Sequence, residues 1–472
     1  MLETFKLLPQ GYHLDDGLLS LAAEVLSEVK GEWEKRDEIT VQNQMRVLRS
    51  FHQVGVSATH FSPGNGYGYG DLGREGIERV FARVFAAEAA LVRWQMVSGS
   101  HALATALFGL LRPGDELLSV TGTPYDTLRE IIGFGQAEST QEKVSPPPEG
   151  EPSAGEWRTQ PDLTGQDPSP RSVSRPGPQD GGRRLNPGSL ADFGVTYRQI
   201  APRMDGTLDE AALREAVNQR TRVVFLQRSR GYTWTAARNL EQIKDYIQRV
   251  KAINPGVLCL VDNCYGEFVE TREPTQVGAD LVVGSLIKNP GGGLAPTGGY
   301  LAGRADLVEA AAARLYAPGL GSHVGPSLGD NRLFFQGLFL APHLVGEAIK
   351  GAIFTARLFE RLGYEVSPHW QEQRTDLIQA LRLGKRERLL SFCQAVQSAS
   401  PVDAHVRPEP WAMPGYSDEV IMAAGTFVQG ASLELSADGP LREPYIAYLQ
   451  GGLVKEQVIL AALLAAQRLG DR

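Results

Sequence analysis

The chain has 472 residues, of which 42% are hydrophobic and 22% charged, and its formal net charge is −8 at pH 7. This composition is typical of a globular protein in water, and the length indicates two packed domains or one large domain with an appendage. No basic stripe is present, which argues against a nucleic acid partner. No run approaches the roughly 18 apolar residues of a membrane span, and the first residues lack the pattern of a secretory signal.

The cysteine content points to a reducing compartment. Cys259, Cys264 and Cys393 are too few and too irregularly spaced for a disulfide framework, and they do not have the spacing of a zinc site. We therefore expect a cytoplasmic enzyme that acts on a small molecule without a metal ion.

The first two thirds of the chain have the pattern of an α/β protein. Residues 17–53 carry apolar side chains at helical spacing and predict an N-terminal helical arm over residues 1–60. A glycine-rich loop follows at residues 62–76. Helical segments then alternate with continuously apolar runs, namely ALVRW, DELLSV, TRVVFLQ, GVLCLVDN and ADLVVGSLIK. Such strands predict a large domain over residues 61–330 with a mostly parallel sheet and helices on both faces.

The last third has a different pattern. Residues 331–362 form one long apolar helix candidate, and a break at Pro342 is an alternative. A helix from residue 385, extended runs near residues 403–406, 420–428 and 431–436, and a closing helix at 453–469 follow. We expect a smaller C-terminal α+β domain over residues 331–472, joined to the large domain by the long helix.

One segment interrupts the alternation of strands and helices. Residues 143–190 are rich in proline, glycine and serine and contain almost no aliphatic side chains. They cannot bury enough apolar surface to offset the entropy lost on ordering. We interpret them as a disordered insertion, with a docking segment as the alternative.

Two glycine-containing turns are candidates for phosphate binding. Residues 68–73, GYGDLG, match G-x-G-x-x-G, but the residues before them do not form a strand, so we reject a dinucleotide site. The SGSH turn, Ser98–His101, follows an apolar run and opens a helix. Its backbone N–H groups and helix dipole would face an anion.

Two charged side chains follow the ends of neighbouring buried strands. Asp262 ends GVLCLVD, and Lys288 follows ADLVVGSLI. Because the carboxyl ends of parallel strands converge, these residues and the upstream turn are the parts of a pyridoxal phosphate site. Lys288 would form a Schiff base, and Asp262 would keep the pyridine nitrogen protonated. Ser285 could add a hydroxyl for the phosphate, and the Tyr125 ring could lie on the cofactor face.

Structural roles for the same residues remain open at this point. Asp262 could cap a turn or, less favourably, bind a metal; Lys288 could be a surface lysine, and Tyr125 a core residue. The three glycines after Lys288, at residues 291–293, fit either a backbone lying close to the cofactor or a flexible turn.

The chain resembles the fold-type I pyridoxal-phosphate enzymes and, within them, the methionine γ-lyase/cystathionine β-lyase-like family, also called aluminium resistance proteins. The segments that carry the resemblance are GYGYGDLGREGIERVF, VSGSHALATALFGLLRPGDELLSVTGTPYDTL, LQRSRGYTW, VDNCYGEFVE, GSLIKNPGGGLAPTGGY and GTFVQGASLELSADGPLREPY. The resemblance implies the fold-type I large domain and a carbon–sulfur lyase that carries out β- or γ-elimination on a sulfur amino acid. Another fold-type I reaction, such as transfer or decarboxylation, and a cofactor-binding regulatory protein without turnover are the alternatives.

The resemblance also implies roles for single residues. Lys288 and Tyr125 would be catalytic, Asp262 would pair with the pyridinium nitrogen, and the phosphate would be held by Ser98, Gly99, Ser100 and Ser285. As a general base, Lys288 would need a pKa lowered by its surroundings. An aromatic residue of the N-terminal loop, Tyr67 or Tyr69, would reach the neighbouring subunit's site, so we expect a homodimer or homotetramer with shared active sites.

One position departs from the family pattern. Related lyases carry an arginine for the substrate carboxylate where this chain has Glu434. Arg442 and Arg230 are the candidates to replace it, because a guanidinium matches a carboxylate with two parallel hydrogen bonds.

Overall fold

The computed structural model describes residues 14–134, 187–203, 206–329, 331–413, 416 and 418–470. The predicted insertion at 143–190 therefore lies, up to residue 186, outside the described residues. Its last residues belong to the fold, since Ser189 and Leu190 are buried. The Leu190 backbone N–H donates to the Ile131 carbonyl at 2.9 Å, so the two flanks of the segment are neighbours.

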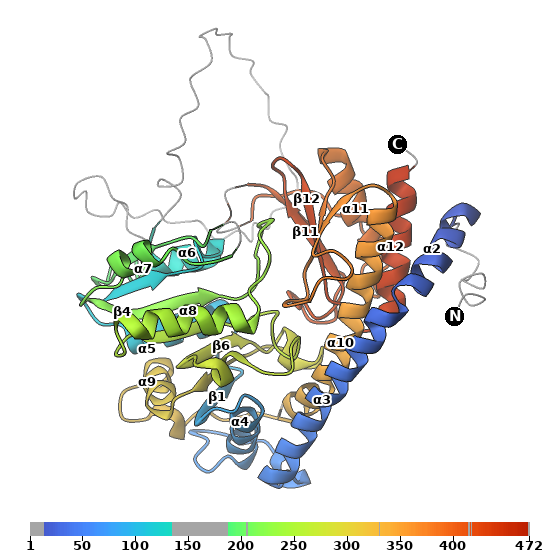
Figure 1. Cartoon of the computed structure of the whole chain (residues 1–472). Helices are drawn as coiled ribbons and strands as arrows, with labels where there is room; N and C mark the ends of the chain where they lie inside the picture. Colours follow the sequence, from blue (N-terminus) through green and yellow to red (C-terminus); the bar gives the residue numbers. More distant parts are fainter. Residues whose placement is uncertain are drawn as a thin grey trace, which may run out of the picture.

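Two helices form the N-terminal arm, α2 (Asp16–Glu28) and α3 (Lys30–Val54). Asp15 caps the first, because its carboxylate accepts from the Gly17 and Leu18 backbone N–H groups. Helix α3 packs along the long helix α10 (Asn331–Arg361), which lies beside it in Figure 1. The Trp33 indole N–H donates to the Lys350 carbonyl at 3.0 Å and anchors this contact.

The central sheet has seven strands in the order β1-β7-β6-β5-β4-β2-β3. The strands are β1 (Ala89–Arg93), β2 (Glu116–Ser119), β3 (Thr196–Gln199), β4 (Thr221–Gln227), β5 (Leu258–Asp262), β6 (Leu281–Ser285) and β7 (Gly299–Gly303). Neighbouring strands pair in parallel from β3 to β6, whereas β7 pairs antiparallel with both β6 and β1. The sheet is therefore mostly parallel, as the apolar strands predict.

Helices cover both faces of this sheet. One face packs against α4 (Leu72–Val84), α7 (Glu210–Ala216) and α8 (Leu240–Ile253), and the other against α5 (Gly99–Leu110), α6 (Asp126–Ile132) and α9 (Ala305–Leu315). Short 3-10 helices lie at Ala58–Phe61, Pro274–Val277, Asn289–Gly291 and Gly321–His323. Burial on both faces explains why β5 and β6 are apolar at nearly every position.

A second sheet lies near one end of the first (Figure 1). Its five antiparallel strands have the order β10-β11-β12-β9-β8 and are β8 (Glu365–Ser367), β9 (Gln379–Arg382), β10 (Val420–Ala423), β11 (Ser436–Pro440) and β12 (Ile446–Gln450). Helices α11 (Arg386–Ser398) and α12 (Lys455–Gly470) complete this part of the chain. Helix α11 packs against one face of this sheet. On the other face, Ile378, Ala380 and Tyr448 pack with Tyr232 and Tyr265, which belong to loops of the large sheet.

Several predicted elements differ from the structure. Residues 403–406 are not a strand, the run at 420–428 is a strand only to residue 423, and β11 begins where the run at 431–436 was expected to end. Strands β3, β7, β8, β9 and β12 were not predicted, because each is three to five residues long and does not stand out as a continuous aliphatic run. The division of the chain into domains at residues 60 and 330 stays a prediction.

Helix α10 runs unbroken through Pro342, as the prediction of one long helix has it, and the alternative of a break there is wrong. It is the only helix among the described residues that is long and apolar enough to cross a membrane, yet 72% of its apolar window is buried inside the fold. Its apolar surface packs against α3 and α12.

One of the three glycines after Lys288 serves this packing. A side chain at Gly292 would place its Cβ 2.1 Å from the Gly337 carbonyl oxygen of α10, and Gly292 has a φ of +55°. The loop can approach the helix only with glycine at this position. Gly292 is therefore held against α10, and closeness of the loop to the cofactor stays a prediction.

Candidate active site

Asp262 stands at the carboxyl end of β5, where the strand leaves the core. The side chain is 3% exposed, and its Oδ1 accepts from the Cys264 backbone N–H at 3.1 Å. Burial raises the pKa of Asp262, and the Cys264 hydrogen bonds and the charge of Lys288 only partly oppose this effect. A buried carboxyl of this kind is stabilised as an anion by any further cation placed against it. The described residues contain no group of three or more His, Cys, Asp or Glu side chains that could hold a metal ion.

Lys288 follows the end of β6 and points into the region between the two sheets. Its Nζ lies 3.8 Å from the centre of the Tyr265 ring and 3.3 Å from the Ser432 Oγ. Burial lowers the pKa of Lys288, but Tyr265, Cys264 and Asp262 raise it more, so the net shift is above the ordinary value. The expectation of a lowered pKa is thus wrong for the chain by itself, because the groups around the amine carry negative or partial negative charge.

The helix α5 begins beside these residues. The Ser98 Oγ caps it by accepting from the His101 backbone N–H at 3.1 Å. A Cβ at Gly99 would lie 3.3 Å from both the Cys264 Sγ and the Ser285 Cβ, so the first turn of α5 faces the ends of β5 and β6. The Ser285 side chain itself is fully buried, and its Oγ accepts from the Ile287 backbone N–H at 3.3 Å.

Tyr125 is placed by two contacts. Its backbone N–H donates to the Gln227 Oε1 at 3.1 Å, which ties it to the end of β4. Its hydroxyl lies 3.2 Å from the Ser100 Oγ. Burial and the nearby charge of Asp262 raise the pKa of Tyr125 well above its ordinary value, so the phenol stays neutral. The ring therefore lies between the α5 turn and Asp262.

These residues fit pyridoxal phosphate. The glycine turn and its two serine hydroxyls provide donors at a helix N-terminus for a phosphate, and Asp262 provides an anion for a ring nitrogen. Lys288 provides the amine, and Tyr125 an aromatic face. The structure brings together all these predicted residues; the role of each stays a prediction.

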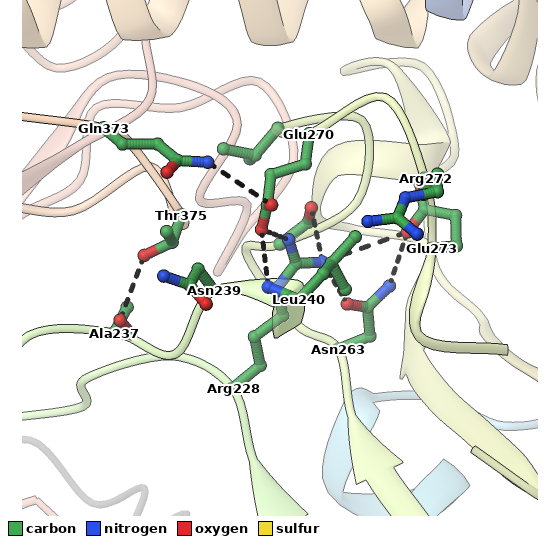
Figure 2. A network of polar contacts seen from close by, with 12 residues as sticks. Arg228, Ala237, Asn239, Leu240, Asn263, Glu270, Arg272, Glu273, Gln373 and Thr375 are labelled. Carbon is green, nitrogen blue, oxygen red and sulfur yellow. Dashed lines mark hydrogen bonds and ion pairs between the residues drawn. The ribbon is translucent and has the colours of Figure 1, made fainter. Parts of the chain in front are cut away.

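A buried ion-pair network supports the end of β5 (Figure 2). Arg228 is fully buried and donates to the Asn263 Oδ1 at 2.7 Å and to the Glu270 Oε1 at 2.9 Å. Asn263, directly after Asp262, donates to the Glu273 Oε2 at 3.1 Å. The same figure shows Gln373, which leads into β9, donating to the Glu270 Oε2 at 3.5 Å. The network therefore fixes the backbone that carries Asp262 and links it to the second sheet.

The arginine candidates differ in their surroundings. Arg442 is half exposed and pairs with Asp418 at 3.0 Å. Arg230 is buried, and its Nη1 donates to the Ser367 carbonyl at 2.9 Å. Sequence reasoning missed a third arginine, Arg374, which is 7% exposed and whose Nε and Nη2 have no hydrogen-bond partner among the described residues. Burial and the neighbouring Arg230 charge lower the pKa of Arg374 to about 10.

Glu434 has a structural task in this chain. Its two carboxylate oxygens accept from the Phe427 backbone N–H at 2.8 Å and the Val428 backbone N–H at 3.0 Å. The carboxylate is buried and holds the loop before β11. The position that faces substrate in related lyases is therefore used here for loop support.

The glycine-rich loop before α4 is docked on the fold. Gly68 has a φ of +69°, and its Cβ would lie 2.8 Å from the Pro326 Cα. Tyr67 and Tyr69 are 62% and 66% exposed, and their rings stack with centres 5.3 Å apart. The loop backbone is thus held in place while both aromatic rings project into solvent.

Sequence reasoning missed four residues that lie around Lys288, namely Cys264, Tyr265, Ser432 and Asp438. It also missed Tyr232, which lies beside Asp438. Tyr265 carried a detectable signal, because it follows Asp262 by three residues at a strand end. Its φ of +71° is uncommon for a residue with a side chain and is found often at functional sites. Asp438 also carried a detectable signal, because it is a carboxylate within the run of small residues SADGP.

Comparison with known proteins gives consistent matches over the chain. A family model described as methionine gamma-lyase matches residues 18–144 and 181–470. The uncharacterised protein YnbB of Bacillus subtilis is 47% identical over 452 residues, covering 96% of each chain.

Solved structures match at the same level. A carbon–sulfur lyase involved in aluminium resistance from Clostridium novyi has a TM-score of 0.85 and 42% identity, covering 99% of both chains. A Listeria monocytogenes protein, provisionally named a cystathionine beta-lyase involved in aluminium resistance, has a TM-score of 0.83 and 45% identity, covering 95% of this chain and 99% of its own. The pyridoxal-phosphate-dependent protein YhfS of Escherichia coli, at 16% identity and a TM-score of 0.57, covers 93% of this chain and 97% of its own, and is similar in fold alone.

Proposed function

Because this chain belongs to the methionine gamma-lyase family, we propose that it is a pyridoxal-phosphate-dependent carbon–sulfur lyase that carries out β- or γ-elimination on a sulfur amino acid. The observation that carries the proposal is the convergence of Lys288, Asp262 and the α5 N-terminus at the ends of β5 and β6. The bound cofactor supplies an electron sink for negative charge that develops at the substrate Cα.

The residues divide the work as follows. Lys288 would hold the cofactor and would take the proton from the substrate Cα. Asp262 keeps the ring nitrogen protonated, and Tyr125 covers one face of the ring. Pairing of Asp262 with a cationic nitrogen offsets one of the charges that raise the pKa of Lys288. The amine thereby moves toward the neutral form that a general base requires.

Arg374 is our choice for the substrate carboxylate, with Arg230 beside it. A buried guanidinium with two nitrogens lacking partners is costly, and a carboxylate would satisfy both at once. Arg442 is less suitable, because water screens its charge and Asp418 already occupies it.

We infer that the protein assembles as a homodimer or homotetramer in the cytoplasm. Tyr67 and Tyr69 project from a docked loop, and Val97 and Phe427 near the site are 62% and 68% exposed. Exposed aromatic and aliphatic side chains of this kind favour burial against a second subunit. The tyrosines would then reach the partner subunit's cofactor phosphate. Three unpaired cysteines fit a reducing compartment.

The test of the proposed function is product formation. We expect the purified protein to bind pyridoxal phosphate with the yellow colour of a lysine-linked cofactor, and to release a keto acid and a thiol from cystathionine, methionine or cysteine. Lys288→Ala should lose both the borohydride-reducible link and turnover. If the wild-type protein is yellow yet releases keto acid from none of these substrates, the lyase proposal is refuted. The alternative of a cofactor-binding regulatory protein without turnover would then be favoured. A reducible link that survives in Lys288→Ala would refute the lysine assignment.

A further inference from the structure

A second buried carboxylate lies in the five-stranded sheet, close enough to Lys288 for the charge of the amine to act on it. Asp438 lies in the middle of β11, is 6% exposed and stands opposite Tyr448 of β12. The next residue, Gly439, points to the other face, where its Cβ would lie 2.9 Å from Leu389 of α11. Because side chains alternate along a strand, Asp438 lies on the face that closes over the ends of β4 to β6.

Polar groups from two directions hold this carboxylate. The Tyr232 hydroxyl, from the segment after β4, donates a hydrogen bond to it. The Gln450 Nε2 of β12 donates to the Asp438 Oδ2 at 3.4 Å. The positive charge that acts on Asp438 is that of Lys288. Asp438 thus lies beside Tyr448, whose ring packs with Tyr232 and Tyr265, and the Lys288 amine lies over the Tyr265 ring.

The surroundings of Asp438 place its pKa near neutral pH. Burial raises the pKa of Asp438 to about 7, against the lowering effects of the Tyr232 hydrogen bond and the Lys288 charge. The other ionisable groups around it, each with a pKa raised by burial, are Tyr416, Tyr448 and Cys393. These three and Tyr232, whose pKa is also raised, stay neutral at pH 7, so Asp438 is the group among them that can exchange a proton.

Cleavage of a carbon–sulfur bond needs such a donor. The bond's electron pair leaves with sulfur, and an alkyl thiolate has a pKa of roughly 8.5. A carboxylic acid with a pKa of about 7 transfers its proton to that sulfur downhill. In the proposed reaction Lys288 takes the Cα proton, so a separate group serves as the proton donor to sulfur.

Given the lyase activity proposed above, we propose that Asp438 is the acid that protonates the departing sulfur atom. As the C–S bond breaks, its electron pair stays on sulfur and the Asp438 carboxyl proton forms the new S–H bond, while Lys288 takes the Cα proton. The carboxylate left behind is held by Tyr232 and Gln450 until it regains a proton from water. The step involves no oxidant or reductant.

The first test varies the leaving group in the holoenzyme. Each sulfur amino acid that turns over is paired with its halide analogue, β-chloroalanine for an S-alkyl cysteine, because chloride leaves without a proton. Asp438→Asn should lower kcat on the thioether by about 100-fold or more and leave the halide within about threefold of wild type. Asp306→Asn, at an exposed aspartate paired with Arg304, is the matched control and should change neither.

The second test uses pH. Since the acid must be protonated, kcat on the thioether should fall as pH rises through the pKa of Asp438, with no such fall on the halide. Tyr232→Phe removes a hydrogen bond that lowers this pKa, so the falling limb should move to higher pH. This variant carries the test if Asp438→Asn does not fold or load cofactor.

The third measurement needs no turnover. An infrared titration of the holoenzyme should show a buried carboxylic acid band that disappears near neutral pH and is missing in Asp438→Asn. Equal losses on thioether and halide, an unchanged thioether rate, or no such band would overturn the role of Asp438. If the wild type releases keto acid from neither substrate, the proposed function fails and this inference falls with it.

Discussion

Replacing Asp262 by asparagine isolates the charge of the proposed ring-nitrogen partner. Asparagine has nearly the same shape as aspartate. The Asp262 Oδ1 accepts from the Cys264 backbone N–H at 3.1 Å, and an asparagine Oδ1 can accept the same hydrogen bond. The network around Arg228 and Asn263 that holds the strand end is untouched. We therefore expect Asp262→Asn to fold and to bind cofactor.

We expect the substitution to lower the rate of the reaction. Asp262 is 3% exposed, so little water screens its interaction with a cationic nitrogen. A hydrogen bond to a charged group contributes about 1.5–3 kcal/mol. If it acts in the transition state, its loss lowers the rate by about 10- to 150-fold, at roughly 1.4 kcal/mol per factor of ten.

The assay is kcat for keto-acid release at saturating cofactor, with the yellow absorbance confirming that Lys288 is still linked. Turnover within about threefold of wild type would refute the reasoning, since roughly 0.65 kcal/mol is less than a buried charge-assisted hydrogen bond supplies. Loss of cofactor binding instead would show that Asp262 serves mainly to hold the group in place.

Three further predictions follow from the same geometry. Arg374→Leu should raise KM for the amino acid substrate by about tenfold or more while Arg442→Leu raises it by less than about threefold, because a buried charge-assisted pair is stronger than an exposed one; the reverse order would favour Arg442. Mixing Lys288→Ala subunits with inactive Tyr67→Phe/Tyr69→Phe subunits should restore activity at one site of each heterodimer, and no recovery in confirmed heterodimers would place the loop's role within its own subunit. Replacing residues 143–186 with a short Gly/Ser linker should leave activity and the melting temperature unchanged, because Leu190 and Ile131 already bring the flanks together; insoluble or inactive protein would show that the segment docks.

The family, the α/β fold class, the lyase class and the pyridoxal phosphate cofactor that the sequence indicates are confirmed. The family and the lyase class come from the resemblance, whereas the signals for the fold class and the cofactor site are local. Long apolar runs between helices specify a buried parallel sheet, and a charged residue directly after such a run must lie at the strand end. Asp262, Ser285, Lys288 and the SGSH turn could therefore be placed at one edge of the sheet without coordinates.

The rest of the site depends on contacts between distant segments. Ser432 is 144 residues from Lys288, and Asp438 faces the same amine from a sheet whose strands are too short to give a periodic pattern. The choice between the arginines also depends on burial, which the sequence does not show. Arg374 is buried, and two of its nitrogens have no partner among the described residues, whereas Arg442 is half exposed and paired with Asp418. The pKa of Lys288 and the loop-holding role of Glu434 likewise follow from which groups lie within a few ångströms. Those neighbours are fixed by how the two sheets pack, since electrostatic and hydrogen-bond energies depend on distance in space rather than on separation along the chain.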